Sequence, residues 1–386
     1  MTGKSEHLYR TGLRSIGVAI LILGLGFSLG FLFLAVRATH NTSDFTVFWT
    51  AGRADPTHVY DAQGITDLQK WLTGNSTKAL RPFAYPPSAL LIFEPLAKLK
   101  FGWSYLLWGI LISSVFLVAS LPYLDRRLIP ILMLSPPVVY GVWGGQPTIL
   151  IAGIILASVT MIGQRPELAG VALGLAAALK PQCLLLVPIG LAASRQWRVL
   201  AFFLTSGMAA VLLSMSIFGI QLWFDWLDAL PRFEHIVDSL DLTRWGVSPA
   251  AIAPMLGLSA TWDLLFKGTG VIAGVALVWM GWRRDDNSIR SPSLICGTLL
   301  VSPYSMPYEL AGLMPFAVTA LFARRLYDVG FILVFPARLA GLAVPFFAVS
   351  LFRKICQSAA LGSQRGDDVV GIAARQNHKL TSDQTD

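Results

Sequence analysis

A small set of polar residues in this chain lies beside long apolar stretches, where their chemistry would matter most. An ionisable side chain at the centre of a membrane costs about 2.5–3.5 kcal/mol on insertion scales, so each one suggests a function. A carboxylate in such a setting can act as a general base, and a cation can stabilise an anionic group. The candidates are Asp44, Asp61, Tyr85, Gln146, Lys180, His235, Arg244, Tyr308 and Glu309.

Asp44 is the candidate base. It precedes the aromatic-rich sequence Phe45-Thr46-Val47-Phe48-Trp49, where a carboxylate could take a proton from an acceptor hydroxyl. Because a helix over 45–53 would begin directly after it, Asp44 could instead cap that helix. The pattern alone leaves both interpretations open.

Lys180 is the candidate cation, since it interrupts the apolar stretch 168–193 next to Pro181. A lysine at such a turn can bind a lipid phosphate as a point charge, or its side chain can extend to the headgroups. Arg244, beside Trp245, could do the same work or simply contact a headgroup.

Three further positions suit substrate contacts. Gln146, in Gly144-Gly145-Gln146-Pro147, offers both a donor and an acceptor to sugar hydroxyls. Tyr85 precedes two prolines where the chain turns into an apolar segment. Glu309 follows Tyr308 and is either a second acid or an ordinary interfacial residue.

The composition excludes a soluble globular domain. Of 386 residues, 54% are hydrophobic and 13% charged, against roughly 25% charged residues in soluble domains. Apolar runs near the ~20 residues that span a bilayer recur along the chain. We therefore expect one all-α polytopic membrane domain over 1–356, followed by a polar, disordered cytoplasmic tail over 357–386. The clearest runs are 15–36, 103–122, 197–219, 262–281 and 329–352.

Basic residues at helix ends predict the orientation of the spans. The net charge of +8 is therefore interpreted as a topology signal, with no nucleic-acid partner. We expect about nine to twelve spans, with a half-depth apolar piece at 88–99. Two outside loops are expected, over 37–87 and over 220–248.

The first outside loop should carry short surface helices at 45–53 and 64–73, with Trp49 and Trp71 at the membrane interface. The candidate polar residues all fall in or near the outside loops. That one-sided distribution fits an interfacial cavity better than a pore. The histidines show no metal-ligand spacing, so we expect neither a metal nor a cofactor.

The ordered set of motifs resembles the bacterial glycosyltransferase family 87 (DUF2029-type), which includes the mycobacterial phosphatidylinositol mannoside mannosyltransferases. The resemblance covers roughly residues 15–325. Two positions depart from the family pattern: Glu309 stands where aspartate is usual, and Pro147 where asparagine is more frequent. The motifs are Asp44-Phe45, Val59-Tyr60-Asp61, Tyr85-Pro86-Pro87, Gly145-Gln146, Leu179-Lys180-Pro181, Arg195-Gln196-Trp197-Arg198 and the stretch 302–310.

The resemblance implies a GT-C-type multi-span helical bundle with a large first periplasmic loop, in the inner (plasma) membrane. It implies transfer of a sugar, mannose above others, from a polyprenyl-phosphate donor to a lipid or glycan acceptor at the outer face, with inversion. Asp44 matches the family's base, and Lys180 with Arg244 would bind the donor phosphate. The remaining candidates would contact substrate: Asp61, Tyr85, Gln146, His235, Tyr308 and Glu309.

Two other functions stay open at this point. A transporter or flippase for a lipid-linked sugar would need no base, but it would need polar residues along a full-depth path. A non-catalytic membrane protein of envelope assembly would leave the clustered polar loops without a role.

Overall fold

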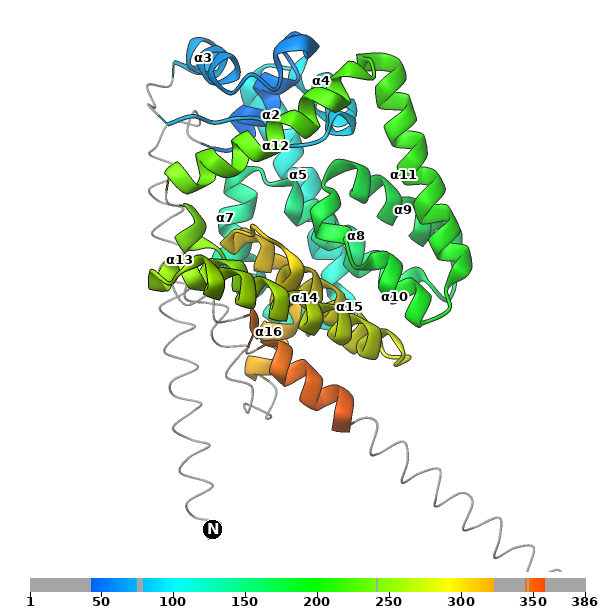
Figure 1. The fold of residues 1–386 in the computed structure, drawn as a ribbon. Helices are drawn as coiled ribbons and strands as arrows, with labels where there is room; N and C mark the ends of the chain where they lie inside the picture. Colours follow the sequence, from blue (N-terminus) through cyan, green and yellow to red (C-terminus); the bar gives the residue numbers. More distant parts are fainter. Residues whose placement is uncertain (1–42, 75–78, 241, 323–343, 346, 358–386) are drawn as a thin grey trace, which may run out of the picture.

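The computed structural model describes residues 43–74, 79–240, 242–322, 344–345 and 347–357 (Figure 1). Within these ranges the chain forms α-helices and short 3-10 helices, and no strand. The expected all-α fold is confirmed. The expected span at 15–36, most of that at 329–352 and nearly all of the tail at 357–386 lie outside the described residues.

Three helices in the described part are long and apolar enough to cross a membrane: α5 (Phe101–Ser120), α11 (Trp197–Phe218) and α14 (Ala260–Trp282). They match the runs predicted at 103–122, 197–219 and 262–281. A fourth apolar segment is broken, because α6 (Ile129–Met133) and α7 (Pro136–Gly144) meet at a bend of 60°. The larger span count stays a prediction, since it depends on shorter helices and on segments outside the described residues.

The remaining bundle helices are short, and prolines set where many of them begin. A proline is tolerated in the first turn because its missing N–H has no partner there in any case. Pro136, Pro147 and Pro166 open α7, α8 and α9 in this way. The short helices are α4 (Leu90–Ala97), α8 (Pro147–Met161), α9 (Pro166–Leu179), α10 (Val187–Ala193), α13 (Ile252–Leu256), α15 (Asn287–Val301) and α16 (Met314–Phe322).

The first loop carries two short helices, as expected: α2 (Phe45–Ala51) and α3 (Ala62–Thr73). All residues of α2 are buried, so the prediction that Trp49 lies at the membrane interface is wrong. The Trp49 indole packs inside the protein and donates to the Leu99 carbonyl at 3.1 Å. Trp71 differs, with 79% of its surface exposed.

The segment expected as the second outside loop is mostly one helix, α12 (Gln221–Ser239), which was not predicted. It follows α11 after Gly219, whose φ of +86° favours glycine. Figure 1 shows α12 crossing near α2 and α5, at the end of the bundle that holds the first loop. The Trp226 indole donates to the Ala84 carbonyl at 3.2 Å and so joins α12 to that loop.

Helices α9 and α11 pack closely through glycines. A Cβ on Gly170 would lie 2.5 Å from the Val199 carbonyl oxygen, and one on Gly174 would collide with the Ser206 hydroxyl and the Phe203 carbonyl. Small residues permit such close contact between membrane helices, where dispersion replaces the hydrophobic effect as the driving force. The two glycines therefore set the distance between α9, which ends at Lys180, and the long α11.

We expect Gly174→Val to destabilise the fold by about 1–3 kcal/mol, because backbone atoms of α11 cannot move aside without separating the helices. The unfolding midpoint in mixed micelles measures the effect. Gly109→Val is the matched control, since a Cβ on this glycine of α5 meets nothing within 4 Å. Equal midpoints for the two variants would contradict the prediction.

Candidate active site

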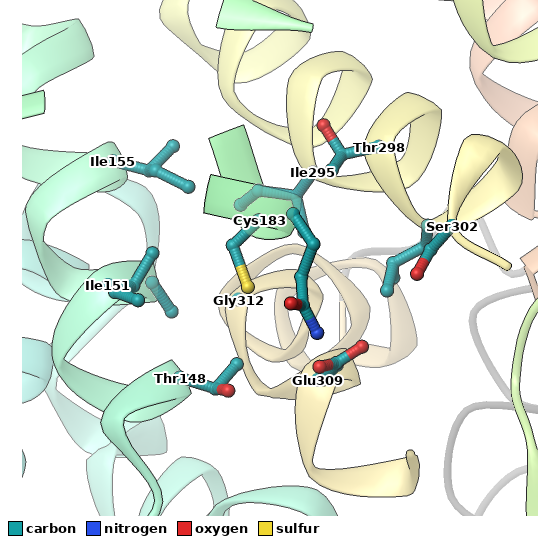
Figure 2. Close-up of a pocket in the computed structure, with 12 residues that line it drawn as sticks. Thr148, Ile151, Ile155, Cys183, Ile295, Thr298, Ser302, Glu309 and Gly312 are labelled. Atoms are coloured by element: carbon teal, nitrogen blue, oxygen red, sulfur yellow. The ribbon is translucent and has the colours of Figure 1, made fainter. Parts of the chain in front are cut away.

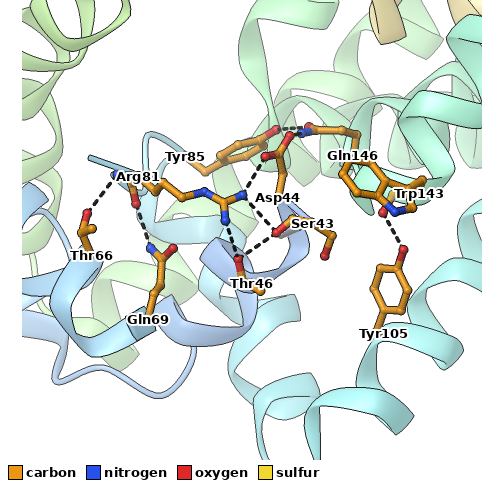
Figure 3. A network of polar contacts seen from close by, with 10 residues as sticks. All are labelled: Ser43, Asp44, Thr46, Thr66, Gln69, Arg81, Tyr85, Tyr105, Trp143 and Gln146. Carbon is orange, nitrogen blue, oxygen red and sulfur yellow. Dashed lines mark hydrogen bonds and ion pairs between the residues drawn. The ribbon is translucent and has the colours of Figure 1, made fainter. Parts of the chain in front are cut away.

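The Asp44 carboxylate is bound on both oxygens. Oδ1 accepts from Arg81 Nη2 at 2.9 Å, and Oδ2 accepts from Gln146 Nε2 at 2.7 Å (Figure 3). Asp44 occupies the N-cap position of α2, yet its side chain makes no capping bond. The helix-cap interpretation of this carboxylate is therefore wrong. Its side chain remains 40% exposed, so a ligand can reach it.

A tight turn brings Gln146 to Asp44. Gly145 has φ +64°, a left-handed conformation that ends α7 and places Gln146 at the N-cap of α8. A Cβ on Gly145 would lie only 2.7 Å from the Cβ of Phe45, so the turn packs directly on α2. Trp108 of α5 secures the turn by donating to the Gly145 carbonyl at 2.7 Å. Glycine is required here both for its conformation and for the space.

Arg81 is a site residue that was not predicted. Its guanidinium pairs with Asp44 and donates to the Ser43 carbonyl at 3.1 Å. Helix α3 holds its backbone, because Thr66 Oγ1 accepts from the Arg81 N–H at 2.9 Å and Gln69 Nε2 donates to the Arg81 carbonyl at 2.8 Å (Figure 3). The available signal was a single basic residue four positions before Tyr85.

Lys180 forms a second polar group with Glu309. Its ammonium lies 2.6 Å from Glu309 Oε1 and 2.9 Å from Thr148 Oγ1. The two charged side chains are only 5% and 6% exposed. The interpretation in which Lys180 extends to the headgroups is therefore wrong, as is the one in which Glu309 is an ordinary interfacial residue. Pro181, at the start of the 3-10 turn after α9, fixes the chain on one side of this pair.

Tyr85 joins the two polar groups. Its hydroxyl donates to Gln146 Oε1 at 3.4 Å, and its ring centroid lies 5.8 Å from Lys180 Nζ. Burial raises the pKa of the Tyr85 hydroxyl, an effect that the positive charge of Lys180 partly opposes. The phenol therefore stays protonated and remains a donor. The Tyr308 ring lies 5.6 Å from the same ammonium, on the Glu309 side.

A cavity extends from the Lys180 pair between α8, the 3-10 turn Pro181–Leu184 and α15 (Figure 2). Thr148 and Glu309 line one end, and Ile155 and Thr298 line the other. Thr148 and Ile155 are seven residues apart on α8, which corresponds to about 10 Å along the helix axis. The lining over this length is mainly aliphatic, with Gln182 and Thr298 as polar members besides Thr148 and Glu309.

Three predicted residues are not part of these groups. Asp61 caps α3, where its side chain accepts from the Gln63 N–H, and it is exposed. His235 is exposed on α12, and we find no described hydrogen bond or ion pair between it and the two groups. The side chain of Arg244 lies outside the described part of the chain. Among the described residues, no cluster of three histidine, cysteine or acidic side chains could hold a metal ion.

The sequence model of glycosyltransferase family 87 matches residues 83–303, more than half of the chain. The chain belongs to this family. A search of curated proteins and of solved structures found no match. Membership of glycosyltransferase family 87 supports an enzyme over a transporter or an assembly protein, and with three spanning helices it supports a place in a membrane. Asp44, Arg81 and Glu309 lie outside the matched residues, so their place in the site rests on the contacts described above.

Substitution of Arg81 by lysine tests whether this residue positions Asp44 in the family 87 enzyme. Lysine keeps the charge, but it cannot bond Asp44 and the Ser43 carbonyl with one planar group. We expect sugar transfer to fall at least about tenfold, the equivalent of one lost bond to a charged group. The initial rate of sugar transfer measures the effect. An unchanged unfolding midpoint shows that the fold is intact.

Arg53→Lys is the matched control, because Arg53 follows α2 and bonds the Leu99 carbonyl without touching Asp44. Its rate should equal that of the unmodified enzyme. Full activity in the Arg81→Lys enzyme would remove Arg81 from the site.

Proposed function

We propose that this enzyme transfers mannose from a polyprenyl-phosphate donor to a lipid or glycan acceptor at the periplasmic or outer face of the inner membrane. One observation carries the proposal. A partly exposed carboxylate, Asp44, and a buried ammonium, Lys180, are joined through Gln146 and Tyr85 into one polar region. A base and a cation are the two groups that transfer from a lipid phosphate requires.

Asp44 is the general base of the proposed reaction. A carboxylate has about four lone-pair positions, and the described contacts with Arg81 and Gln146 use two of them. A third can accept the proton of the acceptor hydroxyl. That oxygen forms the new bond to the anomeric carbon while the bond from this carbon to the phosphate oxygen breaks. The displacement is direct, so the anomeric configuration inverts.

Lys180 stabilises the leaving phosphate in this proposal. The bond pair from the anomeric carbon goes to the phosphate oxygen, where negative charge grows and needs a cation. An ammonium has three donors, and the described contacts of Lys180 use two, to Glu309 and to Thr148. The third can reach a phosphate oxygen. Glu309 holds the ammonium in place beside Tyr85 and Tyr308.

The cavity beside the Lys180–Glu309 pair is lined mainly by aliphatic side chains, among them Ile151, Ile155 and Ile295, with Gln182 and Thr298 as polar members. Its described lining includes no further cation for the diphosphate of a nucleotide sugar. A polyprenyl phosphate brings a single phosphate, which the Lys180 ammonium alone can meet, so this donor suits the site better.

A transfer assay with purified protein in nanodiscs tests the proposal. Polyprenyl-phosphate-[³H]mannose is supplied with a total lipid and glycan extract, and GDP-[³H]mannose replaces it in the matched control. We expect the labelled mannose to reach an acceptor only when the polyprenyl-phosphate donor is supplied. NMR of the product should show an anomeric configuration opposite to that of the donor. Transfer from GDP-mannose alone, or no transfer from any polyprenyl-phosphate sugar, would refute the proposal.

A further inference from the structure

An exposed apolar surface continues from the end of α11 into α12. Ile217, near the end of α11, is 56% exposed, and Ile220, Phe224 and Leu227 are 58%, 53% and 52% exposed. The Trp223 indole fixes the junction of the two helices by donating to Ser214 Oγ at 3.1 Å. Since α11 is long and apolar enough to cross a membrane, its exposed face contacts lipid, and the α12 residues extend that face.

The apolar residues of α12 form two opposite faces. Leu222 and Val237 are 3% exposed and, with Trp226, face the protein. Ile220, Phe224 and Leu227 recur at helical spacing on the other side, rotated by roughly half a turn from the first face. A helix with one apolar face needs a single partner, whereas α12 has a second apolar face whose large side chains remain more than half exposed.

The exposed surface of α12 changes character along the helix. Before Pro231 the exposed side chains include the large apolar residues Phe224 and Leu227, with Gln221 and Asp228 on the neighbouring side of the helix. After Pro231 the exposed side chains are polar, namely Arg232, Glu234, His235 and Asp238. A helix that enters an interface obliquely has this distribution, because only its first half meets the acyl chains. The charges of α12 are mainly acidic, so attraction to anionic headgroups does not drive the contact.

We propose that the first half of α12, residues 220–231, is seated in the bilayer interface on the side that holds the candidate active site. Its partner is the acyl and glycerol region of a lipid leaflet, independent of anionic lipid. Continuity with the lipid-facing surface of α11 selects lipid over a second protein. This inference does not depend on the sugar or the donor proposed above.

The contact between residues 220–231 and the leaflet would affect the position of the active site. Trp226 of the same helical segment bonds the Ala84 carbonyl, and Ala84 precedes Tyr85 and follows Arg81 by three residues. The leaflet would therefore hold the segment that supplies two residues of the site. An enzyme acting on lipid-linked substrates would keep its site at a constant depth in this way.

Site-specific fluorescence tests whether residues 220–231 lie in the bilayer interface. Leu227→Cys is labelled with NBD in a Cys356→Ser background, because Cys356 is the exposed native thiol in the described chain. The protein is placed one copy per nanodisc in phosphatidylcholine. We expect strong quenching by a shallow doxyl lipid, little quenching by aqueous iodide, and no change when phosphatidylglycerol is added.

Glu234→Cys, seven residues further along α12, is the matched control and should show strong quenching by iodide and little by doxyl lipid. Both positions are exposed, so neither label disturbs the packed face. Equal iodide quenching at the two positions would overturn the proposal. Protection of the Leu227 label without doxyl quenching would also overturn it, since a protein would then cover the face. A need for phosphatidylglycerol would count equally against it.

Discussion

Sugar transfer is expected to fall by about 10²–10⁴-fold when Asp44 is replaced by asparagine, the range typical of a lost general base. Asparagine has nearly the same shape and its oxygen can still accept from Arg81, so the fold should persist. In the proposed mechanism, the substitution removes the group that takes the proton of the acceptor hydroxyl. The initial rate of transfer and the unfolding midpoint measure the two effects separately.

Asp61→Asn is the matched control for this experiment. Asp61 lies in the same loop and is exposed, but its carboxylate caps α3 and does not contact Arg81 or Gln146 in the structure. Its replacement should leave transfer nearly unchanged. An Asp44→Asn enzyme that transfers sugar at the normal rate would remove Asp44 from the mechanism.

The second large effect concerns the buried Lys180–Glu309 pair. Removal of one partner leaves an uncompensated charge in the protein interior, so Lys180→Met and Glu309→Met should each destabilise the fold by about 3–5 kcal/mol. The double variant Lys180→Met with Glu309→Met has no such charge and should recover much of that loss. Denaturant titration in mixed micelles measures the free energy of unfolding of the two single variants and the double variant, which together form a double-mutant cycle.

The same variants separate structural stability from catalysis. If Lys180 stabilises the donor phosphate, the double variant should fold well and still transfer little sugar. Lys267→Met is the matched control, because Lys267 pairs with Asp263 on α14 with 39% of its side chain exposed, and such pairs contribute about 0–1 kcal/mol. Additive effects of the two single substitutions, or full transfer by the double variant, would contradict the assigned roles.

Local patterns predicted most of the helices in the described chain. Apolar runs predicted the long helices α5, α11 and α14, because length and hydropathy decide what can cross a bilayer. The helix α12 was missed, since its charged residues obscured its two apolar faces. Trp49 was misplaced because an interfacial tryptophan and a core tryptophan have the same local sequence.

The candidate site was only partly predictable. Asp44, Tyr85, Gln146, Lys180 and Glu309 were all selected as candidates, yet which of them bond to one another was not predicted. Each bond in the site joins residues far apart in sequence, such as the 129 positions between Lys180 and Glu309. Such pairing follows from the packing of whole helices and leaves no periodic trace in the chain. Arg81 was missed for this reason, because nothing nearby distinguishes it from other loop arginines.

The start of α8 carries partners for both charged groups: its N-cap residue Gln146 bonds Asp44, and Thr148 in its first turn bonds Lys180. Reorientation of this one helix would alter proton removal and departure of the leaving group in a single movement. Its orientation is set deep in the bundle, where a Cβ on Gly153 would come within 2.9 Å of the backbone of Phe116. The coupling between removal of the proton and departure of the phosphate would then depend on the contact between Gly153 and Phe116, which is remote from either substrate. Substitutions at this contact should therefore change the rate of transfer.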